Sequence, residues 1–169
     1  MAKDLSLWFY IKSCFTFRFI SNFAILVSIL AYYFNLIEIF IIVIPLVIVN
    51  FIVVNIIQIV NFDELMVGLL GKVLPDKRDR DKIAIEYTLI NEIYHFVPIL
   101  WVMYILQSQE IVKIYRPNFM GTFLKSAIIP IIYYYFESKL EIYGKLNYFG
   151  YSIVYMSLLF LTCIYLYDK

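Results

Sequence analysis

The chain has 169 residues, of which 63% are hydrophobic and 16% are charged, and its formal net charge is +1. The mean hydropathy is +0.83. Only about half of the residues of a soluble globular domain are apolar, so the composition excludes an ordinary soluble domain and favours a membrane protein. The balanced charge argues against a nucleic-acid-binding protein, which would carry a basic surface.

The apolar residues are gathered in runs that are long enough for membrane helices, each of which needs about 20 residues. The sequence therefore predicts an all-α, polytopic membrane helical bundle that forms a single domain over residues 1–169. Prolines within the runs do not count against helices, because membrane helices tolerate them. About five transmembrane helices are expected, over residues 19–34, 39–60, 83–106, 119–136 and 148–167.

The first residues have a different character from the five spans. Residues 5–17 are too short to cross the membrane and are interrupted by Lys12. Trp8, Phe9 and Tyr10 are side chains suited to headgroup depth, so we predict an interfacial helix here. No small-residue cleavage site follows, and no cleavable signal peptide is expected.

The connection over residues 61–82 has an apolar and a charged part. Residues 65–74 are apolar enough to lie on the membrane surface or to pack against the bundle, whereas residues 76–82 alternate in charge and are expected in water. With five spans this connection lies on the same side as the N-terminus.

The distribution of basic residues predicts the orientation of the bundle. Cytoplasmic loops of membrane proteins carry an excess of lysine and arginine. The side of the N-terminus holds most of the 14 basic residues, which predicts a cytoplasmic N-terminus. These residues are Lys3, Lys12, Arg18, Lys72, Lys77, Arg78, Arg80, Lys82, Lys139 and Lys145; the other side holds Lys113, Arg116, Lys125 and Lys169.

The single histidine of the chain, His95, lies within the third predicted span. An ionisable residue in a membrane helix usually faces the bundle interior or a water-filled cavity and is a candidate for function. Asn91 precedes it by four residues and therefore shares its helix face. The alternative is that His95 only forms a hydrogen bond to a neighbouring helix.

A hydroxyl group lies near the start of the first predicted span. Ser21 follows Arg18 closely, and a serine becomes a nucleophile when a base reaches it. Because the chain crosses the membrane twice before the third span, Ser21 and His95 are expected at a similar depth. The alternative is that Ser21 serves helix packing alone.

Other polar groups and cysteines have simpler interpretations. Asn50, Asn55 and Gln58 in the second span are expected to form interhelical hydrogen bonds, or else to line a polar cavity. Cys14 and Cys163 suggest neither a disulfide framework nor a metal site. We therefore expect no metal and no cofactor.

The order of these short motifs resembles the androgen-induced hydrolase family, multi-span enzymes that cleave fatty-acid esters of hydroxy fatty acids, and its bacterial relatives. "RFISNFAIL" is similar to the family's nucleophile motif, with Ser21 at the threonine position. "NEIYHFVP" resembles its histidine motif, with Asn91, His95 and Pro98. "YRPNFMG" and "EIYGKLNYF" follow in the family's order, and the resemblance covers roughly residues 17–167.

The chain departs from the family pattern at three points. Members usually have six spans, and the first has no counterpart here. Serine replaces threonine at position 21, which preserves a hydroxyl group. Tyr143-Gly144 stands where a Tyr-Pro pair is expected.

The resemblance implies a hydrolase of lipid esters, with Ser21 as the nucleophile and His95 as its base. Asn91 would orient the imidazole or donate a hydrogen bond to the oxyanion, and Arg18 would attract an acidic headgroup or anchor the helix to phosphates. Membrane lipids would be the partners. The alternative is a non-enzymatic multi-pass scaffold or lipid-binding protein of the same fold, since fold does not determine function.

Overall fold

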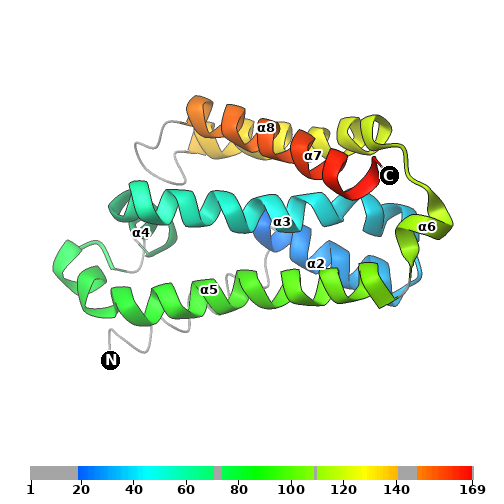
Figure 1. The fold of residues 1–169 in the computed structure, drawn as a ribbon. Coiled ribbons are helices and arrows are strands. Elements are labelled where there is room, and N and C mark those ends of the chain that lie inside the picture. The colour runs from blue at the N-terminus through cyan, green and yellow to red at the C-terminus, as the bar shows by residue number, and fades with distance from the viewer. Residues whose placement is uncertain (1–18, 71–73, 109, 141–147, 169) are drawn as a thin grey trace.

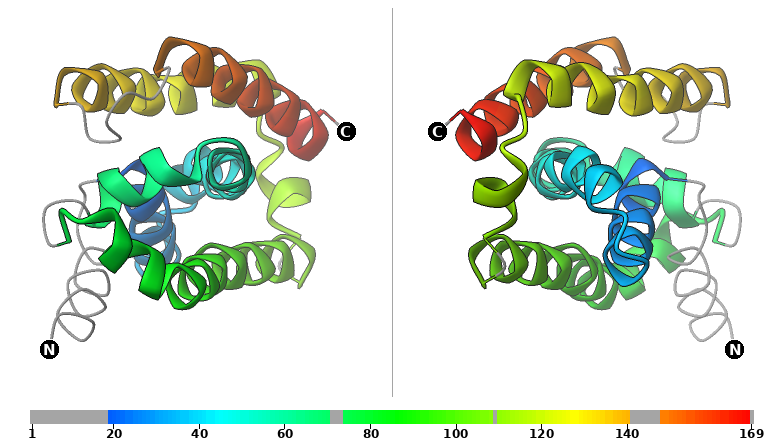
Figure 2. Two further views of the ribbon diagram at one scale, coloured as in Figure 1. Left: turned by 90° about the vertical axis from the view of Figure 1, so that its left-hand side faces the viewer. Right: turned by 90° about the vertical axis from the view of Figure 1, so that its right-hand side faces the viewer.

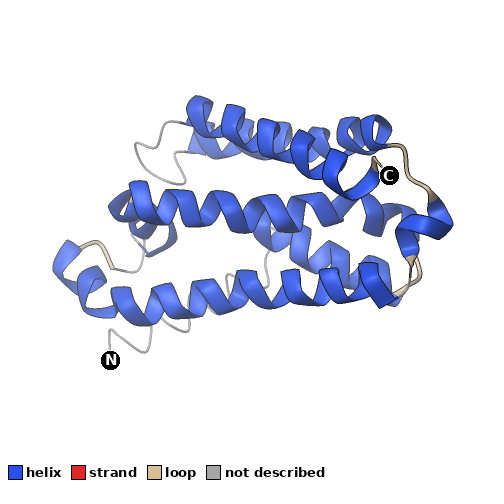
Figure 3. Cartoon of the chain, in the orientation of Figure 1, coloured by secondary structure: helices blue, strands red, loops and turns tan. Residues whose placement is uncertain are grey.

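The computed structural model describes residues 19–70, 74–108, 110–140 and 148–168, and every regular element in these ranges is an α-helix (Figure 3). The all-α prediction is confirmed. The predicted interfacial helix over residues 5–17 and the candidate Arg18 lie outside the described residues. The helices are α2 (Ile20–Tyr33), α3 (Ile37–Val60), α4 (Phe62–Leu70), α5 (Lys77–Ser108), α6 (Ile111–Tyr115), α7 (Phe119–Leu140) and α8 (Tyr148–Tyr167).

Four of these helices are long and apolar enough to cross a membrane, namely α3, α5, the Phe119–Phe136 part of α7, and α8. They correspond to four of the five predicted spans and support a membrane-embedded bundle. The helix in the remaining predicted span, α2, has only 14 residues. At 1.5 Å per residue it extends roughly 21 Å, less than the hydrocarbon core of about 30 Å.

The short length of α2 follows from the way it ends. Asn35 has a φ of 57°, in the left-handed region that asparagine tolerates better than most residues. The Leu36 N–H donates to the Ala31 carbonyl at 2.7 Å, and the Asn35 N–H donates to the Tyr32 carbonyl at 3.1 Å. These two bonds form a Schellman motif, which stops α2 and turns the chain back into α3.

Helix α5 begins earlier than the sequence predicts. The charged stretch was expected to connect two spans, but α5 already begins at Lys77, six residues before the predicted start at 83. The Asp76 carboxylate accepts a hydrogen bond from the Arg78 N–H at 2.8 Å, as an N-cap does. Lys82 and Asp79 form an ion pair at 2.6 Å one turn later. Local capping therefore extends the helix into water.

Helix α3 lies at the centre of the molecule. Figures 1 and 2 show α7 and α8 as one layer on one side of α3, with α2 and α5 on the other side. The turn between α2 and α3 and helix α6 lie at one end of the bundle, and α4 with the start of α5 lies at the other end (Figure 1). Phe40, Ile44, Leu46 and Val49 of α3 are fully buried in the main core.

Side-chain hydrogen bonds between described residues connect the layer of α7 and α8 to α3. Ser126 of α7 donates to the Ile42 carbonyl at 2.6 Å, and Tyr167 of α8 donates to the Ile41 carbonyl at 2.8 Å. Asn61, which follows α3, donates to the Tyr151 hydroxyl of α8 at 2.5 Å. The two ends of this interface are therefore both held by polar contacts within an apolar core.

Helix α4 packs against the first turns of α5. Met66, Leu70 and Leu74 are buried together with Ile83 and Tyr87 in a second, smaller cluster. The sequence left two placements open for the apolar part of the 61–82 connection, on the membrane surface or against the bundle. These residues pack against the bundle.

The outer face of α5 is apolar along its length. Ile85, Leu89, Ile93, Val97 and Leu100 are each more than half exposed. Their spacing of three or four residues places them on one side of the helix. Such a stripe would be costly in water and is typical of a surface that contacts lipid.

Candidate active site

The His95 side chain is buried on α5, with 6% of its surface exposed. Its Nδ1 lies 2.7 Å from the carbonyl oxygen of Asn91, one turn earlier on the same helix. Because a carbonyl only accepts, Nδ1 must carry the proton. In the neutral ring Nε2 is then the basic nitrogen, and it is buried without a hydrogen-bond partner in the described part of the chain. The geometry therefore fixes which nitrogen can act as a base.

The Asn91 side chain contacts the central helix α3. Its Nδ2 donates to the Gln58 Oε1 of α3 at 3.2 Å, and the Gln58 Nε2 donates to the Glu92 Oε1 at 3.0 Å. The group of Asn91 that orients the imidazole is its backbone carbonyl. Gln58 connects α3 to two successive residues of α5 and thereby fixes the rotation of α5 beside His95.

Ser21 lies in the first turn of α2 and is 7% exposed. Its hydroxyl makes no hydrogen bond within the described residues, and neither ring nitrogen of His95 bonds to it. The nucleophile and base that the sequence predicts are thus both buried, but they are not in hydrogen-bond contact.

The two residues nevertheless lie in the same part of the bundle. Gln58 bonds to Asn91, and Phe51 packs on Phe96 with ring centroids 5.8 Å apart, so α3 and α5 are antiparallel. Helix α2 returns into α3 through a tight turn, and α2 therefore runs in the same direction as α5.

A ring contact sets the register of α2 against α5. Tyr32 and Trp101 are in edge-to-face contact, with centroids 5.5 Å apart. Ser21 precedes Tyr32 by 11 residues and His95 precedes Trp101 by six, which correspond to roughly 16 Å and 9 Å along the helices. Both side chains lie on the same side of this contact, separated along the helix axes by roughly 7 Å, a little over one helical turn.

Asn50 of α3 is a further polar residue at this level. It is 3% exposed, and its Nδ2 has no hydrogen-bond acceptor in the described residues. Tyr32 also packs on Phe40, with centroids 5.5 Å apart, and Asn50 follows Phe40 by ten residues while Ser21 precedes Tyr32 by 11. In an antiparallel pair these nearly equal separations bring Asn50 close to the level of Ser21.

The sequence pointed to Ser21 and His95 as candidate site residues, but not to Asn50 and Gln58. Asn50, Asn55 and Gln58 were expected to form interhelical hydrogen bonds. This is confirmed for Gln58 and wrong for Asn55, whose Nδ2 donates to a carbonyl of its own helix. The signal for Asn50 was its distance from the turn, since residues equally far from the turn of a helical hairpin lie side by side. No cluster of three metal-ligating side chains occurs within the residues that the structure describes.

The chain matches no protein-family model, no curated protein and no solved structure. The resemblance to the androgen-induced hydrolase family stays a prediction that depends on short motifs.

Proposed function

We propose that the protein is a membrane-embedded hydrolase of lipid esters, in which Ser21 is the nucleophile and His95 the general base. The observation that carries the proposal is the His95 ring, whose Nδ1 is held by the Asn91 carbonyl while its buried Nε2 has no partner within the described residues. A buried polar atom without a partner is destabilising and needs a reason. A base that awaits the proton of a nucleophile is such a reason.

In the proposed acylation step the Ser21 Oγ attacks the carbonyl carbon of a lipid ester and its proton passes to the His95 Nε2. The tetrahedral oxyanion accepts a hydrogen bond from the Asn50 Nδ2, the second buried group without a partner among the described residues. The bond from the carbonyl carbon to the alcohol oxygen then breaks, and His95 returns the proton to the leaving alcohol. The acyl group stays on Ser21.

Deacylation requires water in the same place. His95 takes a proton from a water molecule, which attacks the acyl carbon and releases the fatty acid, and the Ser21 oxygen recovers its proton. Glu92 and Gln58, both partly exposed beside Asn91, give water a polar route towards the ring. The proposed chemistry further requires a closing movement of α2 towards α5 that brings the hydroxyl within hydrogen-bond reach of Nε2.

The test is ester turnover by the purified, full-length chain with long-chain acyl esters, including fatty-acid esters of hydroxy fatty acids. We expect Ser21→Ala and His95→Ala each to lower kcat by about three orders of magnitude or more. Asn50→Ala removes one oxyanion donor and should lower kcat by about 100- to 1000-fold.

Ser28→Ala is the matched control. Ser28 is a buried serine of the same helix, but its hydroxyl donates to the Ile25 carbonyl at 2.8 Å, so it is already satisfied. Turnover should survive this substitution. Equal activity of the wild type and the Ser21→Ala protein would refute the proposed mechanism.

A second candidate is a non-enzymatic scaffold or lipid-binding protein, and the local pairing of other polar groups favours it. Asn55 donates to the carbonyl of Phe51 in its own helix, and Asn91 pairs with Gln58. Pairing of this kind serves packing alone. A protein of this class would show no turnover, and its Ser21→Ala variant would differ from the wild type only in stability.

A further inference from the structure

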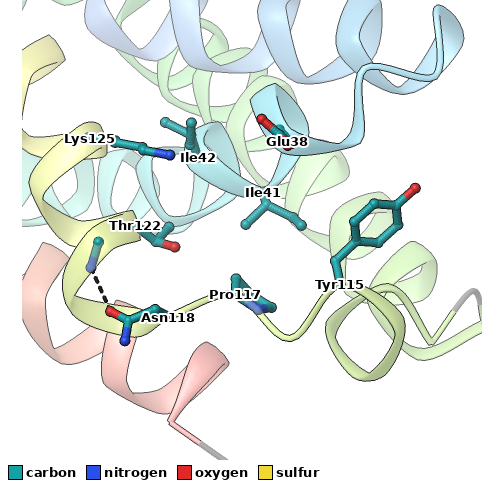
Figure 4. A pocket seen from close by; sticks show the side chains of 9 residues that line it. Glu38, Ile41, Ile42, Tyr115, Pro117, Asn118, Thr122 and Lys125 are labelled. Carbon is teal, nitrogen blue, oxygen red and sulfur yellow. Dashed lines mark hydrogen bonds between the residues drawn. The ribbon is translucent and has the colours of Figure 1, made fainter.

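A pocket of about 230 Å³ lies at the end of the bundle away from α4, between the first turn of α3 and the first turns of α7 (Figure 4). It is lined by side chains of opposite charge together with polar and apolar groups. The lining residues that carry the argument are Glu38, Tyr115, Asn118, Thr122 and Lys125. None of them belongs to the proposed active site.

The two charges of this pocket do not neutralise each other. Figure 4 shows Lys125 extending from α7 towards α3 beside Ile42, and Glu38 lies one turn earlier on α3. No ion pair joins the two side chains, and neither has another ion-pair or hydrogen-bond partner within the described residues. At the same end of the bundle, Lys113 and Glu110 do pair, at 2.7 Å. The charges of the pocket thus remain available to a ligand.

A hydroxyl group lies on the Lys125 side of the pocket, on Thr122 of the same helix (Figure 4). Thr122 is 6% exposed, and its side chain makes no hydrogen bond in the described part of the chain. The Asn118 Oδ1 accepts a hydrogen bond from the Gly121 N–H at 2.8 Å, which leaves the Asn118 Nδ2 as a free donor group. An anionic group near Lys125 would therefore find additional donors from Thr122 and Asn118.

We propose that this pocket binds the headgroup of a zwitterionic phospholipid that carries a primary ammonium, the phosphoethanolamine type. The ammonium would pair with Glu38, and the phosphate would pair with Lys125 and accept from the Thr122 hydroxyl. A single ligand that carries both charges satisfies both side chains at once. The site does not depend on the proposed hydrolase activity.

The surroundings of the pocket favour a lipid over a free, water-soluble headgroup. A second pocket of about 450 Å³ shares the wall formed by Tyr115 and is lined mainly by aromatic and aliphatic residues, including Tyr32, Ile111 and Ile114. Glu38 is the second residue of the apolar helix α3, so the pocket lies where a membrane-spanning helix begins. Headgroup and glycerol-proximal chain would occupy the two adjoining spaces.

The experiment is native mass spectrometry of the delipidated, full-length protein in detergent, titrated with lipids of identical chains and different headgroups. The phosphatidylethanolamine should bind more tightly than the phosphatidylcholine, whose quaternary ammonium offers no N–H donor to Glu38, and than the anionic phosphatidylglycerol. E38Q and K125Q should each weaken phosphatidylethanolamine binding about three- to tenfold. E38Q should also abolish the preference over phosphatidylcholine.

The matched controls are E110Q and K113Q, which make the same charge changes in the neighbouring ion pair outside the pocket. They should leave binding unchanged, and the charge-conserving E38D and K125R variants should retain the preference. Equal binding of all three lipids, or equal losses in the control variants, would overturn the site. Competition by soluble phosphoethanolamine at the concentration of the lipid would overturn the lipid assignment.

Discussion

The His95 imidazole owes its tautomer to a backbone group. Its Nδ1 donates to the Asn91 carbonyl four residues earlier, a bond that every residue type at position 91 can accept. The Asn91 side chain, by contrast, is engaged by Gln58 of the central helix. Orientation of the imidazole and interhelical packing are thus divided between two groups of one residue.

This division predicts the effect of Asn91→Ala. The imidazole keeps its carbonyl partner, so kcat for ester turnover should fall by less than about tenfold. The Gln58 amide loses a partner in a mostly buried place, which should lower the free energy of unfolding by roughly 1–3 kcal/mol. Turnover and thermal unfolding in detergent measure the two effects separately. A loss of turnover as large as that of His95→Ala would show that the side chain is itself catalytic.

The roles of individual polar residues could be predicted from the sequence only in part. A lone histidine in an apolar run and a serine at the same depth are visible in the sequence. Asn50 and Gln58 cannot be distinguished from the sequence, because both are amide side chains of the same predicted span. Only the packing of α3 between α2 and α5 separates Gln58, which has partners, from the Asn50 Nδ2, which has none among the described residues.

For the helices, hydropathy predicted the interiors correctly but not the start of α5. Apolar runs predicted α3, the spanning part of α7 and α8 closely, because the cost of exposing backbone in lipid enforces helix throughout such a run. The ends of α2 and α5 depend on single side chains. Asn35, in a left-handed conformation, ends α2 within one residue of the predicted end, whereas the Asp76 carboxylate starts α5 six residues sooner than hydropathy indicates.

The turn between α2 and α3 gives a prediction at this scale. Asn35→Ala keeps a Cβ in the left-handed region but removes the polar amide that makes this conformation tolerable, and should lower the free energy of unfolding by about 1 kcal/mol. Asn35→Gly relieves the same conformation and should leave stability unchanged or slightly higher. Thermal unfolding of the three proteins in one detergent measures the difference. Equal stability of the alanine and glycine variants would contradict the turn geometry.

In the whole molecule, α3 and α5 run in opposite directions between the two ends of the bundle. Lys77 lies at the end with α4, and Lys113 lies at the end with α6 (Figure 1). Both side chains are exposed. The excess of basic residues predicts that the end with Lys77 is cytoplasmic.

Cysteine accessibility tests this arrangement. In a background without Cys14 and Cys163, Lys77→Cys and Lys113→Cys should react with a membrane-impermeant maleimide from opposite sides of sealed vesicles of known orientation. The Lys77→Cys protein should be labelled from the cytoplasmic side. Labelling of both cysteines from one side would contradict the antiparallel spans, and labelling from opposite but exchanged sides would contradict the predicted orientation.

The central claim is that the Ser21 hydroxyl becomes a nucleophile through the His95 Nε2, and the position of a covalent adduct tests it most directly. The full-length protein would be treated in its membrane with a long-chain fluorophosphonate, digested and mapped by mass spectrometry. We expect a phosphonyl group on Ser21 that is absent from the His95→Ala protein and present in the Ser28→Ala protein. An unmodified Ser21 in the wild type, or an adduct that persists without His95, would contradict it.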